Sequence, residues 1–161
     1  MNKTEIKIIP TPKKAIFGEG NCTVNKCIQT KYELFKKYIS VFTEGASKIL
    51  DTDFYEGAGG IELVYDSSVD AGAYKLSAKC DSFEISASDD EGILYGMASA
   101  LQYITLDENG YITVKVVEIE DFGEKAFRGL MFSLCSWYPL HTIYRYIDIC
   151  FYFKMLYFLH C

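Results

Sequence analysis

The sequence predicts an α+β fold in which two helices cover one face of a mixed or antiparallel sheet, followed by a strand–helix–strand unit. Short segments that alternate apolar and polar residues are grouped before Asp121, as in an antiparallel or mixed sheet. Two longer segments place apolar residues at steps of three and four, as amphipathic helices do. After Asp121, two continuous apolar runs flank one helical segment, which is typical of a parallel βαβ unit.

The N-terminal third holds the first helix and the strands that precede it. Residues 5–9 are short and apolar, and residues 14–17 predict a strand that ends at Gly18 and Gly20. From residue 31 to residue 50, apolar side chains recur at steps of three and four. This spacing predicts one long amphipathic helix over residues 31–50.

The middle of the chain predicts three further strands. Three segments alternate apolar and polar side chains at least in part: residues 61–65, 74–78 and 83–87. Asp81 and Ser82 stand between the last two segments, where they fit a hairpin turn. We therefore expect the last two strands to pair directly.

A second helix is expected over residues 88–104. Ser88 followed by Glu91 forms a capping-box pattern, and the acidic first turn suits the helix dipole. Gly92 and Gly96 lie on one face of this helix. Because no phosphate-loop motif follows them, close packing of the helix against the sheet is favoured over phosphate binding.

The last strand of the sheet is expected at residues 111–117, with a register that continues to Ile119. Beyond it, residues 127–134 and 155–159 have the length and apolar character of buried strands, and residues 140–153 have helical spacing. A single βαβ unit cannot cover its own sheet. We therefore expect further strands, from more chain or from a partner, to complete it.

Residues 143–159 form the most apolar part of the chain. Arg145, Asp148 and Lys154 interrupt this segment, whereas a membrane-spanning helix needs about 20 residues with few charges. The segment therefore predicts a buried helix and a buried strand, with no membrane span. If nothing covers the aromatic-rich tail of residues 138–158, its apolar surface predicts self-association.

Composition excludes several classes of function. The net charge is -6 and no basic run is present, so nucleic acid is not an expected partner. Lys13, Lys14, Lys36 and Lys37 are interpreted as parts of a solvated face. The N-terminus has no long apolar segment of the kind found in secretory signals, which favours a cytoplasmic location.

The cysteines favour reduced thiols over disulfides or a metal site. No CxxC pair is present and the chain has only two histidines, so neither a zinc centre nor a Ser-His-Asp triad is predicted. No cofactor is expected. The six cysteines are Cys22, Cys27, Cys80, Cys135, Cys150 and Cys161.

Four ordered stretches cover nearly all of the chain and together carry a family resemblance. They are the I-P-T-P stretch at residues 9–12, the D-E-G-I-L-Y-G helix of residues 90–102, the pair 119–122 and 127–131, and the helix and strand start of residues 143–155. In this order they resemble glycoside hydrolase family 20, the β-N-acetylhexosaminidases. The resemblance implies an α+β domain over residues 1–122 and the first strand–helix–strand of an incomplete (β/α)8 barrel over residues 123–161.

The resemblance also implies a chemistry. In the family, the substrate's own N-acetyl group attacks the anomeric carbon, a Glu protonates the leaving oxygen, and a neighbouring Asp orients the acetamido group, with retention of configuration. That Asp-Glu pair lies on a later barrel strand. Neither Asp90-Glu91 nor Asp107-Glu108 occupies such a place. We therefore expect no catalytic residue here and no activity from this chain alone, with N-acetylhexosamine glycans as partners of the full-length protein.

One site residue is carried over by the resemblance. Arg128 matches the arginine of the R-G motif and is thereby implied to bind sugar hydroxyls, for which a guanidinium fork is suited. The alternative is an ion pair at the rim of the barrel. Both roles remain open at this point.

Several positions depart from the family pattern. Ser133, Ser136 and Trp137 stand where the family has an Asp and an Arg-His pair. In the K-M-N-x-x-H strand, Leu156 replaces the Asn, and Leu159 takes the His position with His160 one place later, so the tail either is shifted by one residue or lacks the motif. These departures support an alternative function, a non-catalytic glycan- or protein-binding module from a decayed hydrolase.

Overall fold

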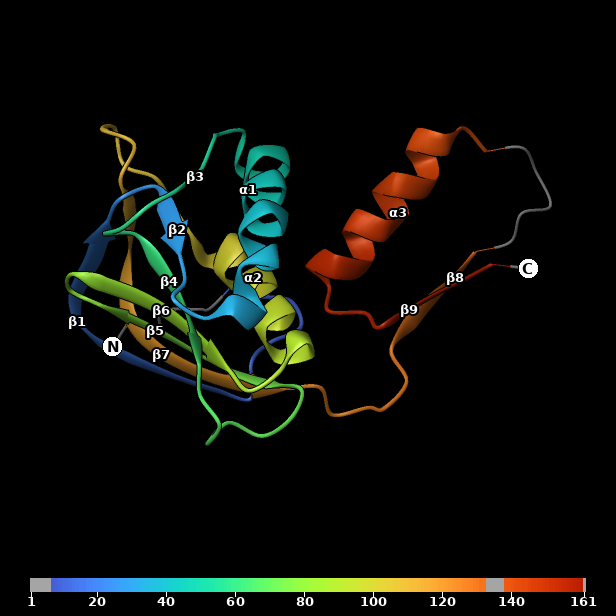
Figure 1. Cartoon of the computed structure of the whole chain (residues 1–161), viewed down its shortest axis with the longest axis horizontal. Helices are drawn as coiled ribbons and strands as arrows, with labels where there is room; N and C mark the ends of the chain where they lie inside the picture. Colours follow the sequence, from blue (N-terminus) through green and yellow to red (C-terminus); the bar gives the residue numbers. More distant parts are fainter. Residues whose placement is uncertain (1–6, 133–137, 161) are drawn as a thin grey trace.

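The computed structural model describes residues 7–132 and 138–160, and Figure 1 shows its two sheets. The larger sheet has the strand order β1-β7-β5-β6-β4-β2-β3. Its pairs are antiparallel from β1 to β6 and parallel from β6 to β3, so the sheet is mixed. Its strands are β1 (Lys14–Val24), β2 (Cys27–Gln29), β3 (Tyr55–Glu56), β4 (Ile61–Tyr65), β5 (Ala73–Lys79), β6 (Ser82–Ala87) and β7 (Ile112–Phe122).

Two helices lie against one face of this sheet, as Figure 1 shows: α1 (Lys37–Leu50) and α2 (Asp90–Tyr103). They bury the inward side chains of the strands, which alternate along β5, and along β7 from Val117 to Asp121, as a period of two requires. The predicted α+β class is therefore confirmed. The largest fully buried side chains of this core include Phe35, Phe42, Leu63, Tyr74, Leu76, Phe83, Ile85, Ile93 and Met97.

Two glycines let α2 approach the sheet closely. A methyl group added at Gly92 would overlap the carbonyl oxygen of Ala73 in β5, and one at Gly96 would overlap the side chain of Ile85 in β6. The packing interpretation of this glycine face is therefore confirmed. The close approach positions the first turn of α2 beside the end of β7, where the site described below begins.

The start of the chain differs from the prediction. Residues 7–9 are not a strand, and residues 5 and 6 lie outside the described part. The strand expected to end at Gly18 instead continues as β1 to Val24, because a register shift between Phe17 and Asn21 absorbs the two glycines. The 3-10 helix η1 (Glu33–Phe35) precedes α1, so the helix expected from residue 31 begins only at Lys37.

The cap of α2 also differs from the prediction. Asp89, not Ser88, is the N-cap residue, and its carboxylate accepts a hydrogen bond from the Gly92 amide at 2.8 Å. Its second oxygen accepts from the Gly72 amide at 2.8 Å, which ties the helix start to the loop before β5. Glu91 is thereby released from capping and is available for another partner.

The second sheet consists of β8 (Gly129–Phe132) and β9 (Tyr157–His160), which pair in parallel and are connected by α3 (Leu140–Tyr152). This confirms the predicted strand–helix–strand pattern, referred to below as the βαβ unit. The expected burial of its helix and second strand is wrong, because the unit has one covered side only. Met131 is 71% exposed and Leu140 61% exposed, and Tyr144, Tyr157 and Leu159 are exposed as well. Within the described residues, no helix is both long and apolar enough to cross a membrane.

Candidate functional site

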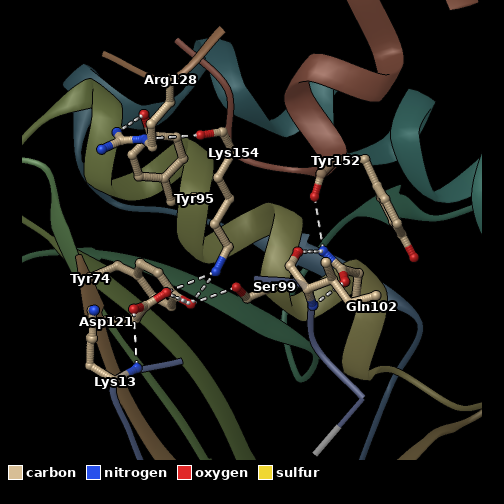
Figure 2. A network of polar contacts seen from close by, with 10 residues as sticks. Lys13, Tyr74, Tyr95, Ser99, Gln102, Asp121, Arg128, Tyr152 and Lys154 are labelled. Carbon is tan, nitrogen blue, oxygen red and sulfur yellow. Dashed lines mark hydrogen bonds and ion pairs between the residues drawn. The ribbon is translucent and has the colours of Figure 1, made fainter. Parts of the chain in front are cut away.

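The candidate site lies where the βαβ unit meets the seven-stranded sheet and its two helices (residues 7–122), called the α+β domain below, and it includes Arg128 (Figure 2). Arg128 directly precedes β8, and its guanidinium turns back onto α2. There its Nη2 donates to Glu91 Oε1 at 2.8 Å and to the Tyr95 hydroxyl at 2.5 Å. The guanidinium carbon also stands 5.1 Å from the centre of the Tyr95 ring, a cation–π distance. The ion-pair alternative thus describes the contacts that Arg128 makes here.

Few donors of Arg128 remain for another ligand. Besides the two bonds from Nη2, its Nη1 donates to the Lys125 carbonyl at 2.6 Å and its Nε to the Lys154 carbonyl at 3.3 Å. A guanidinium has five N–H groups, so at most one is left. A two-pronged grip on sugar hydroxyls would require Arg128 to release some of these partners. Sugar binding by Arg128 stays a prediction.

A buried polar network lies below Arg128, as Figure 2 shows. Lys154, between α3 and β9, reaches into the α+β domain, where its Nζ donates to Asp121 Oδ2 at 2.9 Å and to the Tyr74 hydroxyl at 3.0 Å. Asp121 also accepts from the Lys13 amide at 3.2 Å. Tyr74 and Ser99 share a hydrogen bond of 2.5 Å. Lys154 is only 5% exposed and Asp121 only 7% exposed, so each buried charge is stabilised by the opposite charge of its partner.

The alternation of β7 explains how a carboxylate comes to be buried. Val117 and Ile119 point into the core, and Asp121 is the next residue on the same face. Its side chain therefore enters the interior at the end of the strand, beside Tyr74 of β5 and Ser99 of α2. An ammonium group from the βαβ unit neutralises it.

The pKa values of the network follow from burial and charge. Burial lowers the pKa of the Lys154 ammonium, and the Asp121 carboxylate opposes that shift. Burial, helped by the Asp121 charge, raises the pKa of the Tyr74 hydroxyl. For Arg128, burial acts to lower the pKa, but the hydrogen bond to Tyr95 and the Glu91 carboxylate raise it above its ordinary value. Arg128 is therefore firmly charged at this interface.

A neutral contact adds a third connection between the two parts. The Gln102 amide donates to the carbonyl oxygens of Ile9 at 3.0 Å and of Tyr152 at 2.9 Å, and its oxygen accepts from the Ile9 amide at 2.8 Å. One side chain of α2 thereby holds both the N-terminal segment and the end of α3.

Two cavities flank this interface. A cavity of about 420 Å³ between α2, α3 and β9 is mainly apolar and is lined by residues that include Leu94, Cys150 and Phe151. A smaller one of about 160 Å³ lies under the linker between the two parts and is lined by Lys13, Asp121, Arg128 and Lys154 among others. Four charged residues of the smaller cavity, Lys13, Asp121, Arg128 and Lys154, are already paired with one another or with Glu91 and Glu124.

Three carboxylates of the two Asp-Glu pairs have structural partners. Asp90 forms an ion pair with Lys37 at 2.7 Å, and Glu91 is the partner of Arg128. Asp107 accepts hydrogen bonds from two backbone amides of its own turn. None of these three carboxylates is placed as the acid of a sugar site. Across residues 7–132 and 138–160, no three His, Cys, Asp or Glu side chains are close enough together to hold a metal ion.

The remaining site positions of the prediction are only partly described. Ser133, Ser136 and Trp137 lie outside the described residues. Leu156 and Leu159 are exposed apolar side chains of the βαβ unit. The structure therefore adds no polar group at these two positions.

A comparison with known protein families decides which family this is. The model of glycosyl hydrolase family 20, domain 2, matches residues 5–122, which is most of the chain. This chain belongs to glycoside hydrolase family 20. The matched segment ends at the last residue of β7, so it coincides with the α+β domain.

Solved structures share the fold of this family 20 chain. The exo-β-N-acetylglucosaminidase of Vibrio harveyi aligns with a TM-score of 0.87 and 20% identity, over 96% of this chain and 25% of that one. The β-N-acetylhexosaminidase of Bacteroides fragilis aligns at 0.80 and 25% identity, over 96% and 33%. The N-acetyl-β-hexosaminidase of Streptomyces plicatus aligns at 0.76 and 18%, over 96% and 34%. This chain thus spans between a quarter and about a third of the length of these proteins.

Sequence reasoning missed most residues of the interface in the family 20 chain. In the sequence, Lys154 is a charge that interrupts an apolar run and the first residue of the K-M motif, and Asp121 belongs to the 119–122 stretch of the resemblance, but neither was predicted to form an ion pair. The inward register of Val117, Ile119 and Asp121 was a usable signal, because a carboxylate on a core face requires a buried cation. Tyr95, Ser99 and Gln102 gave no comparable signal, since their partners are distant in sequence.

Proposed function

We propose that this chain is the N-terminal portion of a β-N-acetylhexosaminidase-like glycoside hydrolase, which releases terminal N-acetylhexosamine by substrate-assisted, retaining hydrolysis. The observation that carries the proposal is the alignment with the Bacteroides fragilis β-N-acetylhexosaminidase, at 25% identity over 96% of this chain. Family membership supports the same substrate class. The partners of the full-length protein are then glycans that contain N-acetylhexosamine.

The proposal divides the chain into two domains. Residues 1–122 form the α+β domain, and residues 123–161 form the first strand, helix and second strand of a (β/α)8 barrel. Two observations support this division: the family match ends at residue 122, and β8 and β9 are parallel strands joined by a helix, as in every unit of such a barrel. The edges of this small sheet and the exposed side of α3 are where further units would pack.

The chain by itself is proposed to be inactive. Substrate-assisted hydrolysis needs an acidic Glu beside an Asp that orients the acetamido group, both facing a sugar. The carboxylates of Asp90 and Glu91 are bound to Lys37 and Arg128 instead. The catalytic pair would therefore come from chain beyond the part described here.

A second candidate is a non-catalytic module that binds a glycan. The observation that favours it is the loss of polar family residues at Ser133, Ser136 and Leu159. Titration calorimetry with N-acetylglucosamine and chitobiose tests it directly. Saturable heat from the isolated chain favours the module, and no heat at millimolar ligand counts against it.

The size of the native product tests the hydrolase proposal. An antibody raised against residues 1–120 is used to detect the protein in its source cells. A product several times heavier than 18.3 kDa, with activity towards an aryl N-acetyl-β-glucosaminide after purification, is the expected result. A product of about 18.3 kDa would contradict the proposal.

A further inference from the structure

Two cations enter the α+β domain from corresponding points of the βαβ unit. Arg128 directly precedes β8, and Lys154 lies three residues before β9. Since β8 and β9 are parallel, with Gly129 paired to Tyr157, both cations lie at the same end of the small sheet. That end is the amino-terminal one, and from there the strands extend away from the seven-stranded sheet (Figure 1).

We propose that Arg128 and Lys154 are positioning residues, which fix the βαβ unit on the α+β domain by its amino-terminal end. The α+β domain is then the rigid support to which the βαβ unit is attached, and it is called the mount below. In parallel α/β sheets, ligands bind at the carboxyl ends of the strands, and the amino-terminal end serves stability. The mount therefore leaves the carboxyl ends of the strands accessible. This inference does not depend on the proposed hydrolase activity.

The buried contacts of Lys154 with Asp121 and Tyr74, called the Lys154 lock below, attach the βαβ unit to the α+β domain. Its ammonium is buried with one carboxylate and one hydroxyl, and all of these acceptors come from the α+β domain. The backbone of Lys154 adopts a left-handed conformation with φ 58°, which residues other than glycine seldom adopt. Lys154 adopts it at the turn between α3 and β9, from which its side chain reaches Asp121 and Tyr74. Removing the ammonium would leave the buried carboxyl group of Asp121 without its ion-pair partner.

The Arg128 contact connects the same two parts and also joins the strands. Its side chain binds Glu91 and Tyr95 of α2, while its carbonyl oxygen accepts from the amides of Leu156 at 2.7 Å and Tyr157 at 3.0 Å. Gly123 leaves room for the guanidinium, because a methyl group there would overlap it. The linker, α2, β8 and β9 are thus all connected through Arg128.

A third cation supplies a matched control. Lys48 of α1 pairs with Asp148 of α3 at 2.9 Å, so it also bridges the two parts. Both partners of this pair are about half exposed. Exposed pairs contribute little to stability, whereas breaking a buried pair is strongly destabilising. Lys48→Met and Lys154→Met therefore remove the same charge from the same interface in two different environments.

Limited proteolysis of the complete 161-residue chain tests the Lys154 lock. Trypsin cleaves at Lys125 in the linker, and mass spectrometry measures the rate at which the 1–125 fragment appears. We expect Lys154→Met to raise this rate on the order of 100-fold, with the fragment itself remaining resistant. Lys48→Met should stay within about threefold of the wild type. In Asp121→Asn/Lys154→Met, which buries no charge, resistance should return to within about tenfold.

Three results would overturn the Lys154 part of the proposal. The first is cleavage of Lys154→Met no faster than that of Lys48→Met. The second is a first domain that is digested as fast as the linker, which would mean global unfolding and no separate mount. The third is a double variant as sensitive as Lys154→Met, which would show that the charge pair is not what holds the unit.

Hydrogen exchange tests the Arg128 part separately. Gly123→Ala expels the guanidinium and removes no charge. We expect the Leu156 and Tyr157 amides to exchange on the order of 10-fold faster in this variant, while amides of β5 and β6 keep their protection. Unchanged exchange at Leu156 and Tyr157, or an equal loss of protection in β5 and β6, would remove Arg128 from the mount.

Discussion

Gly92→Ala probes the contact that brings α2 against the sheet and Glu91 towards Arg128. The new methyl group would overlap the Ala73 carbonyl oxygen and lie 3.0 Å from the Ala87 methyl. A backbone carbonyl in a paired strand cannot move aside, so the start of α2 must shift outwards. Overpacking of this kind costs about 1–3 kcal/mol, and occasionally more. Alanine is the better helix former by about 1 kcal/mol at an interior position and by less in a first turn.

The expected net effect is a loss of about 1–3 kcal/mol of unfolding free energy, or roughly 2–4 °C of melting temperature for each kcal/mol. Urea unfolding and thermal melting, both followed by circular dichroism, measure it. Gly45→Ala in α1 is the control, because its methyl group would meet only side-chain ends, 3.1 Å from Leu101 Cδ1 and 3.6 Å from Phe151 Cε1. It should be neutral or stabilising by up to about 1 kcal/mol. A Gly92→Ala protein as stable as Gly45→Ala would refute the packing argument.

Three further predictions concern pH, thiol reactivity and association. Burial raises the pKa of Tyr95 and Tyr103 to about 12 from the ordinary 10.0, so their contribution to stability is complete below pH 10 and is lost as pH rises through about 12. Because the pKa of Lys154 is lowered from 10.5, this group makes the protein more stable as pH rises towards 10.5. Urea unfolding should therefore show the steepest loss of unfolding free energy above pH 10.5, and an unfolding free energy that stays constant up to pH 12 would contradict this. Cys80 is exposed, whereas Cys22 is buried with a pKa raised to about 11, so a thiol reagent followed by peptide mapping should label Cys80 before Cys22, and equal rates at these two residues would be the contrary result. The exposed apolar side of the βαβ unit should make the isolated chain associate as concentration rises in sedimentation velocity; a monodisperse monomer that binds little hydrophobic dye would contradict this.

Elements with a strong local period could be predicted from the sequence. The alternation in β5 and β6 and the glycine face of α2 each fixed both the element and its buried side. The parallel βαβ unit followed from its two apolar runs. These signals are local, because each depends on which side chains share one face of one element.

The remaining elements depend on partners that are distant in the chain. β2 and β3 have three and two residues, too few to show a period, and they exist because neighbouring strands pair with them. β1 passes Gly18 and Gly20 because β7 accommodates the irregularity. The N-cap of α2 is Asp89 and not the expected Ser88. The second carboxylate oxygen of Asp89 accepts a hydrogen bond from the Gly72 amide, a contact that no local motif specifies.

The candidate site was the least predictable part for the same reason. The family resemblance pointed to Arg128, but not to the partners that occupy its donors. The ion pair of Lys154 and Asp121 joins residues separated by 33 positions, and Tyr74 is 80 positions from Lys154. In the sequence, only the position of Asp121 on the inward face of β7 indicated a buried charge. The buried state of the βαβ unit was mispredicted because apolar sequence indicates what a side chain favours, not whether a partner is present to cover it.

We propose that Asp90, Glu91 and Asp107 of this family 20 chain serve its structure and that the chain holds no catalytic acid. The most direct test is to incubate the purified 161-residue chain with an aryl N-acetyl-β-glucosaminide and to measure aryl release against a buffer blank. We expect no turnover above the blank from a chain that circular dichroism shows to be folded. Turnover that disappears in Glu91→Gln or Glu108→Gln would contradict it, because a catalytic acid would then lie within this chain.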